Sequence, residues 1–164
     1  MVINRQRRVP VASLSIEKFL VRVTKILHIP REAAAVSLVT DAQMARWNRV
    51  YRGKAKATDV LSFPADASAA QEPVKSRKQA RARRSKSARS RWHLTARSGS
   101  YLGDIAIAPA VARRNAREFG RTFDDEMRIL VLHGVLHLLG YDHETDHGEM
   151  EKLELRLRRR LGIG

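Results

Sequence analysis

The stretch from His133 to His143, HGVLHLLGYDH, constrains this chain more than any other part of the sequence. It overlaps a nearly apolar run, Ile129 to Leu139, which is well short of the roughly 20 residues that a membrane-spanning helix needs. The pattern predicts a helix from about Phe123 to Leu139 that ends at Gly140. Histidines therefore lie on a helix and on the turn that follows it.

Three of these histidines are spaced like the ligands of one metal ion. His133 and His137 are four residues apart, so their imidazoles project from one helix face. Gly140 allows the left-handed backbone that turns the chain back and brings His143 to the same point. Three nitrogen ligands leave a fourth tetrahedral position open for water, as in catalytic zinc sites. His147 continues the spacing and is a rival third ligand.

The spacing His-x-x-x-His-x-x-Gly-x-x-His is also that of the metzincin proteases. Their helix carries a general-base glutamate directly after the first histidine, where this chain has Gly134. A peptidase would then lack its proton acceptor. The chain also has no cysteine, so any metal must be held by histidines and carboxylates.

The charge of the chain is strongly positive. Its 32 lysines and arginines face only 17 acidic residues, which favours a polyanionic partner such as nucleic acid. Ten of the basic residues lie between Glu72 and Arg97, in a segment with almost no large apolar side chain before Trp92. Such a composition predicts a mobile basic insertion at about residues 70–99. A solvated loop and an arm that binds phosphates both fit it.

The remaining sequence alternates strand-like and helix-like patterns. It predicts an α+β fold in which a small mixed sheet of about four strands packs with about five or six helices. We expect residues 1–164 to form a single domain. The expected strands are 2–5, 34–40, 58–63 and 101–108. The expected helices run from Ser13 or Ser15 to 27, from an Asp41 cap to 51, and over 109–119, 123–139 (capped by Thr122) and about 144–161.

The first residues carry no export signal. Arg7, Arg8 and Pro10 interrupt the N-terminal sequence, which lacks the apolar core of about 7 to 15 residues that a secretory signal needs. We therefore expect a soluble, cytoplasmic protein that has no contact with membranes.

The histidine stretch and two further segments resemble the signature of the YbeY family of bacterial rRNA maturation factors, which are zinc-dependent single-strand endoribonucleases. NRVYRGKAKATDVLSFP, residues 48–64, resembles the family's Asn-x-x-Tyr-Arg to Thr-Asp-Val-Leu-Ser-Phe-Pro block. LGDIAI, residues 102–107, resembles its Leu-Gly-Asp-Ile strand. The chain departs from the family at Ala55, where an aspartate is common, and in the length of the basic insertion.

The resemblance implies a metzincin-like metal helix, with one zinc ion per chain held by His133, His137 and His143, and a functional arginine at Arg52. A guanidinium suits this role because it can hold a phosphodiester with two hydrogen bonds. Either a metal-activated water or the RNA's own 2′-hydroxyl would attack the phosphorus. Asp59 and Asp104 could orient ligands or cap turns, whereas Asp142 and Glu144, which flank His143, could orient ligands or act as the base.

Single-stranded RNA, rRNA or a ribosomal subunit is the expected partner, and rRNA processing the expected role. Two alternatives stay open. One is a noncatalytic, zinc-stabilised assembly factor that binds rRNA, and the other is a metallopeptidase.

Overall fold

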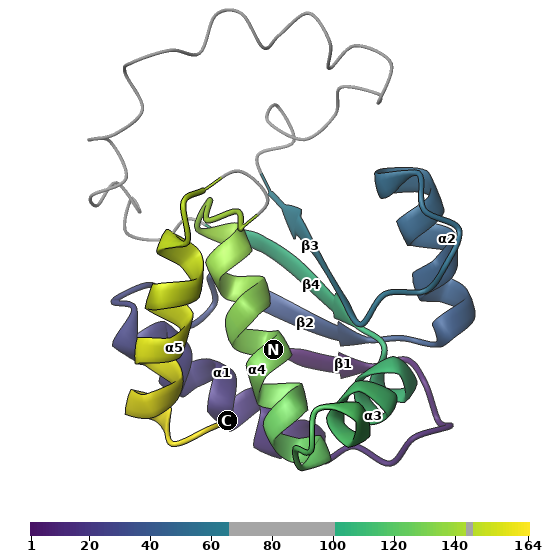
Figure 1. The fold of residues 1–164 in the computed structure, drawn as a ribbon, viewed down its shortest axis with the longest axis horizontal. Coiled ribbons are helices and arrows are strands. Elements are labelled where there is room, and N and C mark those ends of the chain that lie inside the picture. The colour runs from purple at the N-terminus through teal and green to yellow at the C-terminus, as the bar shows by residue number, and fades with distance from the viewer. Residues whose placement is uncertain (66–100, 144–145) are drawn as a thin grey trace, which may run out of the picture.

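The computed structural model describes residues 1–65, 101–143 and 146–164 (Figure 1). In this part of the chain the strands are β1 (Val2–Asn4), β2 (Ala34–Leu38), β3 (Val60–Pro64) and β4 (Gly103–Ile107). The helices are α1 (Ser13–Ile26), α2 (Asp41–Arg52), α3 (Pro109–Glu118), α4 (Phe123–Leu138) and α5 (Glu149–Leu161). The predicted α+β class, with a small mixed sheet, is confirmed. The predicted basic insertion lies outside the described residues.

The four strands form one sheet in the order β1-β2-β4-β3. β1, β2 and β4 are parallel, whereas β3 runs antiparallel to β4 at the edge of the sheet. The central strands are rich in alanine and β-branched residues and are largely buried, as expected for parallel strands covered on both faces. Ile105 of β4 lies opposite Val36 on one side and Ser62 on the other.

Helices cover both faces of this sheet. Figure 1 shows α1, α4 and α5 together on one face and α2 on the far side of β3. The larger core lies beneath the three helices and includes Leu20, Val36, Ile105, Ile107, Val131, Leu132, Leu136 and Leu157. A smaller cluster under α2 contains Val39, Met44, Leu61, Ala106, Ala108 and Val111.

Helix α4 packs very closely on the sheet at Gly134. A Cβ atom at this position would lie 2.7 Å from Cγ2 and 3.0 Å from Cδ1 of Ile105 in β4. The Ser62 hydroxyl of β3 donates a hydrogen bond to the Gly134 carbonyl at 3.2 Å. Position 134 therefore faces the sheet and has no room for a side chain, which gives a physical reason why no glutamate follows His133.

Threonine side chains cap the N-termini of α2 and α4. Thr122 caps α4 as predicted, because its hydroxyl accepts a hydrogen bond from the Asp125 backbone N–H at 3.0 Å. The predicted cap of α2 at Asp41 is wrong. Thr40 takes that place and accepts from the Gln43 N–H at 3.2 Å.

Helix α5 begins at Glu149, so the predicted start at about residue 144 is wrong. Gly148 has a left-handed backbone, with φ of 87°, which stops the helix from extending backward. The Asp146 carboxylate accepts hydrogen bonds from the backbone N–H groups of Gly148 and Met150, both at 2.8 Å. These bonds lower the pKa of Asp146 because they stabilise its charged form, the Met150 bond most.

The strand boundaries lie within two residues of the predicted ones. Among the described residues, no helix is both long and apolar enough to cross a membrane.

We expect Gly134→Ala to destabilise the protein by about 1–3 kcal/mol, because the added methyl overpacks the contact with Ile105. In a helix without this contact, the same change stabilises by about 1 kcal/mol. Urea unfolding measures the difference. In an Ile105→Ala background the penalty should largely disappear, and an equal penalty in both backgrounds would contradict the packing argument.

Candidate metal centre

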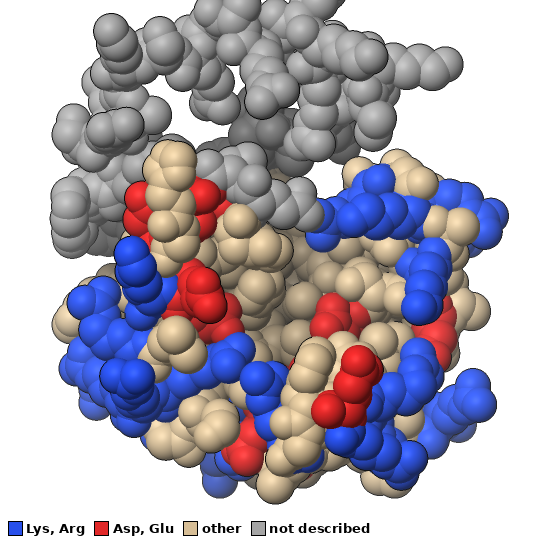
Figure 2. All heavy atoms as spheres, in the orientation of Figure 1, with Lys and Arg blue, Asp and Glu red and all other residues tan. Residues whose placement is uncertain are grey.

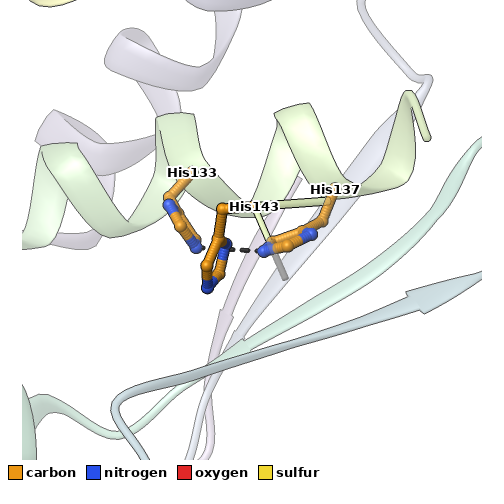
Figure 3. A group of neighbouring side chains, drawn as sticks. All are labelled: His133, His137 and His143. Atoms are coloured by element: carbon orange, nitrogen blue, oxygen red, sulfur yellow. Dashed lines mark hydrogen bonds between the residues drawn. The ribbon is translucent and has the colours of Figure 1, made fainter. Parts of the chain in front are cut away.

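Three imidazoles converge at the C-terminal end of α4 (Figure 3). Nε2 of His133 lies 3.0 Å from Nε2 of His137, one helical turn further along. The ring of His143, from the loop after the helix, has its centroid 5.3 Å from each of the other two. Ligand atoms from all three residues lie within 4.8 Å of one another, so this cluster could hold a metal ion.

The turn after α4 brings His143 back to the helix. Gly140 has φ of 90°, and its N–H donates to the His137 carbonyl at 2.9 Å. The next N–H, of Tyr141, donates to the Leu136 carbonyl at 3.1 Å. These bonds satisfy the free carbonyls of the last turn and reverse the chain. The predicted stop at Gly140 is confirmed, and with it the approach of His143.

The other nitrogen of each helical histidine is held by a hydrogen bond. Nδ1 of His133 lies 2.8 Å from a carboxylate oxygen of Glu154, and Nδ1–H of His137 donates to the Tyr141 carbonyl at 2.9 Å. A carbonyl only accepts, so His137 carries its proton on Nδ1. Its Nε2 lone pair then points toward Nε2 of His133, an arrangement that a cation between them stabilises.

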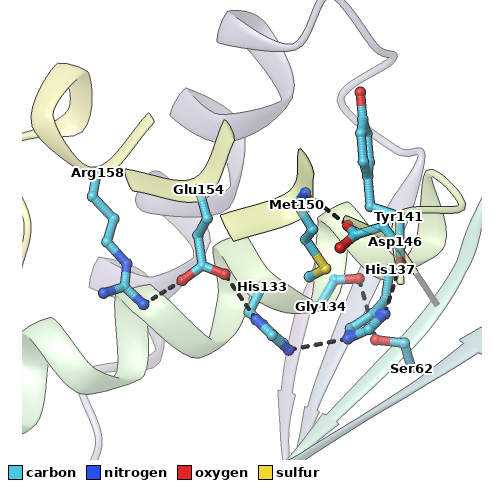
Figure 4. Close-up of polar contacts among 9 residues, drawn as sticks. All are labelled: Ser62, His133, Gly134, His137, Tyr141, Asp146, Met150, Glu154 and Arg158. Atoms are coloured by element: carbon cyan, nitrogen blue, oxygen red, sulfur yellow. Dashed lines mark hydrogen bonds and ion pairs between the residues drawn. The ribbon is translucent and has the colours of Figure 1, made fainter. Parts of the chain in front are cut away.

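Glu154 belongs to a buried ion-pair network on α5 (Figure 4). Its second carboxylate oxygen accepts a hydrogen bond from Arg158, one turn further along the helix. Burial alone would raise the pKa of Glu154, but the hydrogen bond with His133 and the charge of Arg158 outweigh it and lower the pKa. The carboxylate is therefore charged and orients the His133 ring.

The surroundings of His137 favour its neutral form, which is the form that binds metals. Burial lowers the pKa of its imidazole, and the neighbouring His133 and His143 rings lower it further. Metal ligation needs a deprotonated imidazole nitrogen, so this shift favours binding at neutral pH.

The other residues singled out from the sequence lie in different surroundings. His147, the rival ligand, lies outside the cluster that the described residues form. Asp59 accepts hydrogen bonds from the Val60 N–H at 2.8 Å and from Asn115 on α3 at 2.9 Å, so it joins β3 to α3. Asp104 accepts from the Tyr101 hydroxyl at 2.8 Å. Burial and this hydrogen bond raise the pKa of Tyr101 to about 12.

Three candidates remain predictions. Arg52 is exposed in the last turn of α2, on the other side of β3 from α4 (Figure 1). Asp142 is half-buried directly before His143. Glu144 lies outside the described residues.

Glu154 is not among the residues predicted from the sequence, although the sequence carries a signal for it. In α5 the buried residues are Met150, Glu154, Leu157 and Leu161, which follow the spacing of a core-facing stripe. A glutamate in such a stripe needs a buried partner. His133 and Arg158 are those partners.

The sequence is similar to that of one family of known proteins. The model of the family described as Endoribonuclease YbeY matches residues 1–162. An Endoribonuclease YbeY from Solibacter usitatus is 41% identical over 150 residues, which are 91% of this chain and 79% of the relative. One from Koribacter versatilis is 37% identical over 163 residues, 99% of this chain and 86% of the relative.

A solved structure has the same fold. The solution structure of a Thermotoga maritima protein aligns with a TM-score of 0.55 and 26% sequence identity. The alignment covers 98% of this chain and 89% of that protein.

Replacing Glu154 should weaken metal binding. We expect Glu154→Ala to lower zinc affinity by about 10- to 100-fold, because the His133 ring loses the carboxylate that orients it. Competition with a chromophoric chelator measures this change. Glu154→Gln keeps an acceptor oxygen, so its zinc affinity should fall less than that of Glu154→Ala.

Glu151→Gln is the matched control, because Glu151 lies on the same helix but is exposed. Urea unfolding of the metal-free variants separates a loss of affinity from a loss of fold. Unchanged zinc affinity in folded Glu154→Ala would contradict the orienting role.

Proposed function

The chain belongs to the YbeY family of endoribonucleases, and on this basis we propose that it is a zinc-dependent endoribonuclease that cleaves single-stranded RNA during the processing of ribosomal RNA. The observation that carries the proposal is the convergence of His133, His137 and His143. Ribosomal RNA or a ribosomal subunit is the proposed partner, and the cytoplasm the proposed location.

The histidine cluster fits zinc in its donor chemistry. Zinc is commonly held by imidazole nitrogens, and three protein ligands are typical of its catalytic sites. Both helical imidazoles have Nδ1 occupied by hydrogen bonds, so Nε2 is the atom available to an ion. When bound, zinc would act as a Lewis acid and stabilise negative charge on the phosphodiester oxygens. The surrounding residues would then fix the ligands and position the RNA.

Each of these residues has a defined task in this proposal. Glu154 holds the His133 ring through a charged hydrogen bond, and Arg158 keeps that carboxylate ionised. The Tyr141 carbonyl fixes the His137 tautomer. We assign Arg52 to the substrate, because a guanidinium can bind a phosphodiester through two parallel hydrogen bonds and stabilise the charge that develops on it.

The basic character of the chain supports an RNA substrate. A formal charge of +15 attracts the phosphate backbone irrespective of sequence. The metallopeptidase alternative loses support at Gly134, because the contact with Ile105 leaves no space for the glutamate that such enzymes use.

Metal removal and replacement of a ligand test this proposal together. We expect about one zinc per chain, and cleavage of a single-stranded RNA that stops on chelation and resumes when zinc is restored. His137→Ala should lower the cleavage rate by at least about 100-fold, because one of three ligands is lost. Circular dichroism and RNA binding should stay close to those of the wild type.

His147→Ala is the matched control, since it removes a neighbouring histidine outside the cluster, and it should cleave normally. Global unfolding of His137→Ala would favour the noncatalytic, zinc-stabilised assembly factor. Metal-dependent cleavage of protein but not of RNA would favour the metallopeptidase. Products that end in a 2′,3′-cyclic phosphate would identify the 2′-hydroxyl as the attacking group.

The assignment of Arg52 has its own test. We expect Arg52→Lys to lower kcat by about 10²–10³-fold with unchanged zinc content, because lysine keeps the charge but not the paired hydrogen bonds. Arg46→Lys changes an exposed arginine on the same helix and should cleave like the wild type. If Arg52→Lys cleaves RNA as fast as Arg46→Lys, Arg52 has no role in catalysis.

A further inference from the structure

The last turn of α2 carries large apolar side chains that are exposed and not buried in the core. Val50 is 67% and Tyr51 54% exposed, and the two residues are adjacent in sequence. Consecutive residues of a helix do not face each other, so Tyr51 presents an exposed apolar surface of its own. Tyrosine is well suited to a binding site, because its ring offers a large contact area and has few rotatable bonds.

The Tyr51 ring packs against the ring of Phe63 in β3. Its centroid lies 5.1 Å from that of Phe63 in β3, with an angle of 73° between the ring planes. Trp47, one turn earlier on α2, contacts the same Phe63 ring at 5.7 Å and 78°. Both contacts are edge-to-face, and they fix the orientation of Tyr51 while more than half of the residue stays exposed. A ring held in this way loses little entropy when a ligand binds.

The surface around Tyr51 is cationic. From residue 42 to residue 58 the sequence contains no aspartate or glutamate. Exposed basic residues lie on the last turn of α2 and on the loop after it, namely Arg49, Arg52, Lys54 and Lys56. Figure 2 shows the blue of arginine and lysine gathered over α2. This charge complements a phosphate backbone.

Strand β3 connects this surface to the histidine cluster. Ser62 donates its hydrogen bond to Gly134, the neighbour of His133, whereas the next residue, Phe63, contacts Tyr51. Successive side chains of a strand point to opposite faces. In Figure 1 the last turn of α2 and the C-terminal end of α4 lie at the same end of the molecule. One extended ligand bound at the histidines would have to pass the edge strand β3 at this end to reach Tyr51.

We propose that Tyr51 stacks against an unpaired base of the RNA strand that is cleaved at the histidine cluster, while Arg49 and Lys54 contact its phosphates. This inference rests on the proposed function and specifies how the substrate is held. Stacking on an aromatic side chain needs an unpaired base, because paired bases have their faces covered by their neighbours. Stacking on Tyr51 would therefore favour single-stranded RNA irrespective of its base sequence.

RNA binding to the full-length, metal-free protein tests the proposal, because binding is then measured without cleavage. We expect Tyr51→Ala to weaken the binding of a fluorescent single-stranded oligonucleotide by about tenfold, the loss expected for one stacked base. Tyr51→Phe keeps the ring and should bind within about twofold of the wild type. Fluorescence anisotropy measures both affinities.

The matched control is Phe119→Ala, which removes another aromatic side chain of similar exposure, 56%, at the end of α3. It should bind RNA like the wild type. Circular dichroism checks the fold of each variant. Equal RNA affinities for Tyr51→Ala and the wild type would overturn the proposal and point to a protein partner for Val50 and Tyr51.

Salt dependence separates stacking from charge. Arg49→Gln should reduce the slope of log affinity against log salt by about 0.7, the value for one phosphate contact on a single strand. Tyr51→Ala should leave that slope unchanged, and a reduced slope would contradict stacking. Failure of the zinc-loaded wild type to cleave RNA would instead remove the proposed function, which these binding measurements do not test.

Discussion

The fold depends on the close contact between α4 and β4 at Gly134. Because position 134 has no side chain, the helix backbone lies directly on Ile105, and the Ser62 hydroxyl reaches the Gly134 carbonyl. Helix α4 is buried along most of its length. His133 and His137 lie on a side that neither core covers fully. The rotation of the helix that buries its apolar residues therefore also sets where the two imidazoles emerge.

The C-terminal helix completes this arrangement from outside. Helix α5 packs its apolar stripe on α4 and places a charged carboxylate in that stripe, where it contacts His133. A buried carboxylate is costly unless it is paired, and here it has two partners. Asp146 caps the start of α5 and so helps to fix the position of Glu154 along the helix axis.

Much of this structure could be predicted from the sequence, because the signals were local. The helix stop at Gly140 and the Thr122 cap depend on residues three or four positions apart, and the structure confirms both. The histidine spacing likewise predicted the cluster. The start of α5 could not be read in this way, since Gly148 and Asp146 override a helical pattern that extends further back. Glu154 was missed because its partner His133 is 21 residues away, and only packing brings the two together.

The alternation of side chains along β3 has a mechanical consequence. Ser62 lies opposite Ile105, and Phe63 lies opposite Asp104, so neighbouring residues of one short edge strand serve the two faces of the sheet. A slip of β3 by a single residue would exchange these faces, turning a phenyl ring toward α4 and a hydroxyl toward α2. The histidine cluster and the aromatic surface would then be disturbed in the same event, so the hydrogen-bond register of this strand controls both.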